Sequence, residues 1–137
     1  MKVTLERLDD AFHMQASNED GLTVHSDGSP EIGGHNLAMR PMQMVLAALG
    51  SCSSIDVIYL LNKQRQPLRD IKIEVKGERV DTVPKVFKAI HVHYQLFGDV
   101  EENKAERACR ISMEKLCSVS MMLKESVDIT WSYEVLA

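Results

Sequence analysis

Cysteine is the residue type in this chain with the widest range of chemistry, and it occurs at positions 52, 109 and 117 of 137 residues. A cysteine thiolate attacks peroxide oxygen to give a sulfenic acid, and a nearby second thiol condenses with that acid before irreversible overoxidation. A buried cysteine, by contrast, usually behaves as a small apolar side chain. Cys109 stands eight residues before Cys117 in one predicted helix, and packing is its expected role. For Cys52 and Cys117, redox chemistry and packing are both open.

The histidines are weaker candidates for chemistry. His91 and His93 alternate on a predicted strand, so their side chains point to the same side. They could be two metal ligands, but no further Cys or His pair stands at a zinc-site spacing, and we expect a partly exposed strand face. His35, in a glycine-containing loop, could line the mouth of a pocket. We expect no metal and no cofactor.

The composition is that of a soluble globular protein, with 45% hydrophobic and 26% charged residues. The net charge of -4 argues against nucleic acid or an anionic membrane as partner. The first ten residues lack a secretory pattern, and the apolar stretch 42–52 is shorter than the roughly 20 residues that span a bilayer. We therefore expect one cytoplasmic domain, residues 1–137, in which any disulfide is transient, catalytic or redox-sensing.

Changes in hydrophobic period predict an α+β order of elements. Three short strands come first, then a long helix, two longer strands, a second helix, a short third helix and a final strand. Their predicted ranges are 3–7, 12–16 and 22–24, then 41–62, then 71–75 and 86–97, then 101–116 and 119–124, and last 127–135. The segment 77–85 contains Asp81 and Pro84 and is predicted to be a turn.

The first predicted helix carries Cys52 and is apolar around almost its whole circumference, which is typical of a buried helix. Pro41 suits its first position. Small residues surround Cys52, and Gly50 is among them although glycine inside a helix costs roughly 1 kcal/mol relative to alanine. We therefore expect another part of the backbone to approach this helix closely.

Two segments match the pattern of a known family. One runs from Pro41 through Ala47 and Ala48 to Cys52, and the other, residues 116–120, reads Leu-Cys-Ser-Val-Ser around the second cysteine. Together with the order of strands and helices, they make the chain resemble the OsmC/Ohr family over nearly its whole length. The resemblance implies the OsmC-like fold, an intertwined homodimer with antiparallel sheets around two long central helices.

The resemblance also implies a function for the two cysteines. In the family the first cysteine attacks an organic hydroperoxide and the second resolves the product to a disulfide, roles that fall here on Cys52 and Cys117. The site would lie at the subunit interface, and a dithiol such as a lipoyl group would be the reductant. The expected enzyme is a thiol-dependent hydroperoxide reductase, that is, a peroxidase.

The chain departs from the family in the charges that support the peroxidatic cysteine. Family members have a glutamate just after the helix-starting proline and an arginine in an early strand or turn. Here Met42 and Gln43 occupy the first place, and residues 17–20, Ser-Asn-Glu-Asp, occupy the second. The alternative function is therefore a non-peroxidatic OsmC-like protein that senses redox state or binds a small apolar ligand.

Arg40 is the nearest replacement for the missing positive charge. It precedes Cys52 by twelve residues, or about 18 Å along a continuous helix at 1.5 Å per residue. Arg40 could help within its own subunit only if the loop folds back. Otherwise it could act on the cysteine of the other subunit, and Arg7 could do so from the first strand. A thiolate in apolar surroundings needs such a charge to form at neutral pH.

Overall fold

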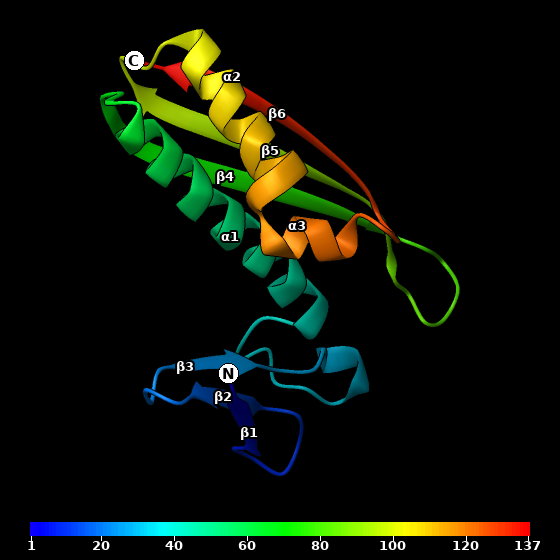
Figure 1. Ribbon diagram of the computed structural model, residues 1–137. Coiled ribbons are helices and arrows are strands. Elements are labelled where there is room, and N and C mark those ends of the chain that lie inside the picture. Colours follow the sequence, from blue (N-terminus) through cyan, green and yellow to red (C-terminus); the bar gives the residue numbers. More distant parts are fainter. The chain divides into compact units, whose positions relative to one another are not determined.

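The computed structural model describes residues 1–137 and divides them into two compact units, residues 1–45 and 46–137. We describe each unit by itself (Figure 1). The expectation of a single domain stays a prediction.

The first unit is built on a three-stranded antiparallel sheet in the order β1-β2-β3. Its strands are β1 (Val3–Arg7), β2 (Met14–Asn18) and β3 (Thr23–Ser26). All three predicted strands are confirmed, but the second begins two residues later than expected. The Asp9 carboxylate accepts hydrogen bonds from the backbone N–H groups of Ala11 and His13, and these bonds hold the segment before β2 in a turn.

The loop after β3 folds around one buried carboxylate, that of Asp27. It accepts hydrogen bonds from the backbone N–H groups of Leu37, His35 and Gly28. The bond from Leu37 contributes most to holding the pKa of Asp27 below its ordinary value. Because the carboxylate stays ionised, it can fix this loop, which includes a 3₁₀ turn at Pro30–Ile32.

The second unit packs helices on a three-stranded sheet in the order β4-β5-β6. Figure 1 shows α1 and α2 on the same face of this sheet. Val92, Tyr94 and Leu96 of β5 alternate with less buried neighbours and are fully buried, as are Leu49 and Leu61 of α1. The elements are α1 (Pro41–Lys63), β4 (Leu68–Arg79), β5 (Phe87–Gly98), α2 (Glu102–Ile111), α3 (Ser118–Leu123) and β6 (Asp128–Leu136).

β6 lies parallel to β5, with Tyr94 opposite Tyr133. The expectation of antiparallel sheets is therefore wrong for this strand, whereas β4 and β5 are antiparallel as expected. Parallel neighbours need a crossover connection of a dozen or more residues, and α2 and α3 provide it. The α+β class is confirmed.

β4 extends through Gly77 to Arg79, so the predicted turn 77–85 is shorter than expected. A Cβ atom at Gly77 would run into the ring of Phe87 and come within 3.1 Å of Leu46 Cδ2. Glycine here therefore makes room for a buried aromatic ring inside a strand. Gly50 is closely approached by a side chain and not by the backbone that we expected, since a Cβ there would lie 3.0 Å from Val75 Cγ2.

The second predicted helix does not continue as an α-helix to Leu116. α2 ends at Ile111, and the segment Ser112–Leu116 is a π-helical turn in which the Cys117 N–H donates to the Ser112 carbonyl at 2.8 Å. Single π turns are frequent at functional sites because they redirect side chains. Here the turn buries Ser112 and Cys117 at its two ends.

α1 leaves apolar side chains exposed in the single chain. Ile55 and Tyr59 are 64% and 62% exposed. By length and composition α1 could cross a membrane, with a mean hydropathy of 1.8, but core helices of soluble proteins pass the same test. The expectation of no membrane partner stays a prediction.

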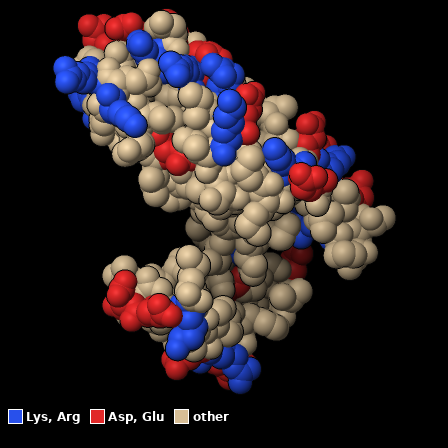
Figure 2. Space-filling view, viewed as in Figure 1, with Lys and Arg blue, Asp and Glu red and all other residues tan.

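Figure 2 shows Lys and Arg interspersed with Asp and Glu on the visible face of the second unit.

Candidate functional site

The structure brings Cys52 and Cys117 together. Cys52 lies on α1, and Cys117 lies between the π turn and α3. Their Sγ atoms and a carboxylate oxygen of Asp56 all lie within 4.8 Å of one another. Both cysteines are free thiols; Cys117 is fully buried and Cys52 is half-buried. Two sulfurs this close can form a disulfide after a small movement, because the S–S bond is about 2.05 Å long.

Asp56 is the residue of this site that sequence reasoning missed. It follows Cys52 by four positions on α1, and residues at this spacing lie on one helix face. The spacing could have placed Asp56 beside the thiol, but nothing in the sequence distinguishes it from a carboxylate at the surface. In the fold it is half-buried.

Three buried hydroxyl groups support the carboxylate. Ser53 Oγ makes hydrogen bonds with the Tyr94 hydroxyl and with Ser112 Oγ, the latter at 2.8 Å. Ser112 Oγ also donates to Asp56 Oδ2 at 3.1 Å. Burial raises the pKa of Tyr94 far above its ordinary value, so its hydroxyl stays protonated and can donate. The network joins α1, β5 and the π turn and orients Asp56 toward the thiols.

The buried thiols of Cys117 and Cys109 stay protonated at neutral pH. Burial raises the pKa of Cys117 to about 11; the neighbouring Cys52 adds to the rise, and the Ser120 N–H, which donates to Cys117 Sγ at 3.4 Å, opposes it. Burial likewise raises the pKa of Cys109 to about 12. Cys109 is fully buried and lies outside the sulfur–carboxylate cluster. Its packing position agrees with the expectation from sequence.

Arg40 lies in the first unit, just before α1. Its guanidinium donates to the Ala38 carbonyl at 2.9 Å and to Asn36 Oδ1 at 2.8 Å. These bonds order the end of the loop. The expected role of Arg40 at the cysteine of another subunit stays a prediction.

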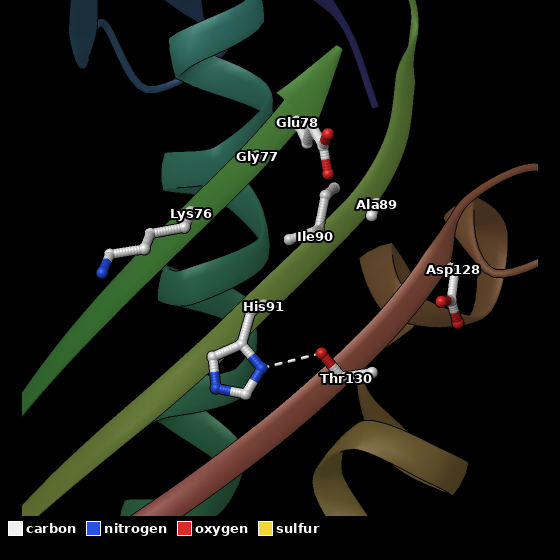
Figure 3. Close-up of a pocket in the computed structure, with 8 residues that line it drawn as sticks. All are labelled: Lys76, Gly77, Glu78, Ala89, Ile90, His91, Asp128 and Thr130. Carbon is white, nitrogen blue, oxygen red and sulfur yellow. Dashed lines mark hydrogen bonds between the residues drawn. The ribbon is translucent and has the colours of Figure 1, made fainter. Parts of the chain in front are cut away.

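His91 and His93 share one face of β5, as expected, and both engage β6. Each has both ring nitrogens within hydrogen-bond distance of β6 side chains, and Ser132 Oγ lies 2.8 Å from His91 Nε2 and 2.7 Å from His93 Nδ1. A shallow hollow of about 200 Å³ adjoins His91, and Figure 3 shows this side chain on the side of the strands away from α1. The polar ladder leaves these histidines no free ring nitrogen for a metal.

His35 is mostly exposed, and its Nδ1 lies 3.5 Å from Asp9 Oδ2. It therefore anchors its loop to the turn before β2. The expectation that it lines the mouth of a pocket stays a prediction.

The family model for OsmC-like protein matches residues 34–132, which include both cysteines and Asp56. The chain belongs to the OsmC-like protein family. The resemblance seen in the sequence is thereby confirmed. This family includes organic hydroperoxide resistance proteins, and the OsmC-like site described above lies wholly within the matched residues.

Relatives of this OsmC-like protein support the assignment. Protein YhfA of Escherichia coli strain K12 is 38% identical over 128 residues, which cover 86% of this chain and 93% of YhfA. A hypothetical protein from Aquifex aeolicus VF5 has a solved structure with a TM-score of 0.85 and 36% identity, covering 98% of this chain and 94% of that one.

A more distant structure shows the same OsmC-like fold. An organic hydroperoxide resistance protein OsmC from Legionella pneumophila has a TM-score of 0.73 and 22% identity and covers 98% of this chain and 97% of its own. The OsmC-like fold is thus confirmed, while the homodimer implied by the family stays a prediction.

Proposed function

We propose that this protein is a thiol-dependent peroxidase that reduces organic hydroperoxides through Cys52 and Cys117. The observation that carries the proposal is the approach of the two sulfurs and the Asp56 carboxylate to within 4.8 Å of one another. A sulfenic acid needs a second thiol at this range to form a disulfide before overoxidation. Membership of the OsmC-like family supports the same chemistry.

The first step oxidises Cys52. Its sulfur attacks the outer peroxide oxygen, the O–O bond breaks, and the products are the Cys52 sulfenic acid and an alcohol. The outer oxygen stays on sulfur with its hydrogen. The thiol proton passes to the Asp56 carboxylate and from there to the departing alkoxide oxygen, which leaves as the alcohol. Asp56 lies within 4.8 Å of the sulfur, and Ser112 holds it in place.

The second and third steps restore the thiols. The Cys117 thiol attacks the sulfenic sulfur, a disulfide forms and water leaves. A dithiol of the lipoyl type then reduces the disulfide by exchange and becomes a cyclic disulfide. The thiol–disulfide cycle needs no bound cofactor.

The positive charge that favours the Cys52 thiolate would come from a second subunit. In the proposed homodimer, Arg40 of the partner subunit approaches Cys52, or Arg7 does so. Arg40→Ala or Arg7→Ala should then lower the rate at which Cys52 reacts with peroxide. Arg7→Ala should change the free energy of unfolding by only about 0.5 kcal/mol, as a surface substitution does, whereas Arg40→Ala also removes two hydrogen bonds that order its loop.

The test is turnover of cumene and tert-butyl hydroperoxide by the reduced, metal-free protein with dihydrolipoamide, with hydrogen peroxide for comparison. We expect the bulky peroxides to be preferred and Cys52→Ser and Cys117→Ser to have no turnover. Asp56→Asn keeps the shape of the side chain but cannot take the proton, and it should lower the rate by about 100-fold or more.

Cys109→Ala is the matched control, because it removes a buried thiol that lies outside the cluster. It should turn over at the wild-type rate. Equal turnover by wild type and Cys52→Ser, or none by folded wild type with both thiols free, would contradict the proposal.

The second candidate is a redox-responsive or small-ligand-binding protein without peroxidase activity. The raised pKa of Cys117 and the carboxylate beside the pair favour it, because both oppose thiolate formation. Mass spectrometry of the protein treated with cumene hydroperoxide and no reductant separates the two. A Cys52–Cys117 disulfide that forms slowly in this experiment, together with no turnover when dihydrolipoamide is supplied, supports the second candidate.

A further inference from the structure

We propose that Cys52, Asp56 and Cys117 form a Zn²⁺ site in the reduced protein. This inference goes beyond the peroxidase and does not rest on it. Two thiolate sulfurs and one carboxylate oxygen are a donor set that zinc accepts, and the fourth tetrahedral position would be open to water or another ligand.

The spacing of the donors fits a zinc ion closely. The three atoms already lie within 4.8 Å of one another. With Zn–S bonds of about 2.3 Å and Zn–O bonds of about 2.0 Å, tetrahedral sulfurs are about 3.8 Å apart and sulfur and oxygen about 3.5 Å apart, so the ligands need to close by about 1.3 Å or less. Cys52 and Asp56 come from one rigid helix turn, and a rotamer adjustment of Cys117 completes the set.

The surroundings also fit a metal. Ser112 Oγ donates to Asp56 Oδ2, which is the kind of outer hydrogen bond that orients a ligating carboxylate. No Lys or Arg lies within ion-pair distance of Asp56. A divalent cation would therefore neutralise negative charge that no cationic side chain pairs with inside the chain.

Zinc binding and disulfide formation would exclude each other, because both use the two sulfurs. Oxidation of Cys52 and Cys117 to a disulfide would remove two of the three ligands and release the ion. The metal would in turn protect the thiols from peroxide. The site would thus bind zinc according to the redox state of the cysteines.

The test uses Co²⁺ as a coloured substitute for Zn²⁺, added without oxygen to the reduced, chelator-treated full chain. We expect one Co²⁺ per chain, with near-ultraviolet thiolate-to-metal absorption and the intense visible bands of a tetrahedral site, all lost when Zn²⁺ is added. Ser112→Ala should weaken binding by about 10- to 100-fold. Asp56→Asn should weaken it at least as much, and Cys52→Ser should reduce the thiolate absorption.

Two controls keep the test decisive if a variant folds poorly. Cys109→Ala should bind Co²⁺ like wild type, because its thiol lies outside the cluster. Wild type oxidised to the disulfide should not bind. Co²⁺ spectra without thiolate absorption, or the same affinity in oxidised and reduced wild type, or in wild type and folded Asp56→Asn, would overturn the proposal. None of these readouts depends on peroxide turnover.

Discussion

Ser112 and Tyr94 each place a buried hydroxyl against Ser53, but only Ser112 also donates to Asp56. The hydrogen-bond network therefore has two roles, and Tyr94 takes part in only one of them. Hydrogen bonds among buried hydroxyls stabilise the joint between α1, β5 and the π turn, because an unpaired buried polar group is costly. The bond from Ser112 to Asp56 also fixes the orientation of the carboxylate that lies beside the two thiols.

Ser112→Ala and Tyr94→Phe form a matched pair for testing this division. Both should lower the free energy of unfolding by about 0.5–1.5 kcal/mol, because each removes one hydrogen bond to the buried Ser53 hydroxyl and leaves it the other. Only Ser112→Ala should also lower the rate of peroxide turnover several-fold, because it frees Asp56 to turn away from Cys52. Urea denaturation and steady-state turnover measure the two effects. Equal losses of turnover in both variants would mean that the network acts on the site only through stability.

At the scale of elements, hydrophobic period was enough to find the strands and helices of both units. It could not show that β6 runs parallel to β5, because burial alternates in the same way along parallel and antiparallel strands. It also could not show the π turn, which depends on how the chain packs beyond α2. The cysteine pair came from the resemblance to a family. Asp56 was missed because its role depends on Cys117, which is distant in sequence.

Gly77 offers a prediction about the packing of β4. A methyl group there would meet the Phe87 ring and approach Leu46, both of which pack against it in the second unit. Because overpacking a core typically costs 1–3 kcal/mol, Gly77→Ala should lower the free energy of unfolding by about that amount. Its exposed strand neighbour provides the control, since Lys76→Ala should change stability by only about 0.5 kcal/mol. Thermal or urea denaturation of the two variants decides, and similar stability in both would contradict the packing argument.

At the scale of the whole molecule, α1 exposes apolar surface that the single chain does not cover. The helix is apolar around most of its surface, yet only 28% of its most apolar window is buried. Soluble proteins rarely expose a contiguous apolar surface of this kind unless a partner covers it. In the homodimer proposed above, a second copy of the chain would cover this surface, with α1 at the centre of the contact.

Ile55 and Tyr59 test this arrangement, because they are the most exposed apolar side chains of the second-unit part of α1. Ile55→Lys and Tyr59→Lys should convert a dimer into monomers, since each would place a charge in an apolar interface with no partner of opposite sign. Light scattering after size exclusion measures the mass, and circular dichroism confirms that the helices persist. Val83→Lys is the matched control, because Val83 is 88% exposed in the connection between β4 and β5 and should leave the dimer intact. A monomeric wild type that binds lipid vesicles would instead mean that α1 faces a membrane, and the proposed supply of Arg40 from a partner subunit would fail with the dimer.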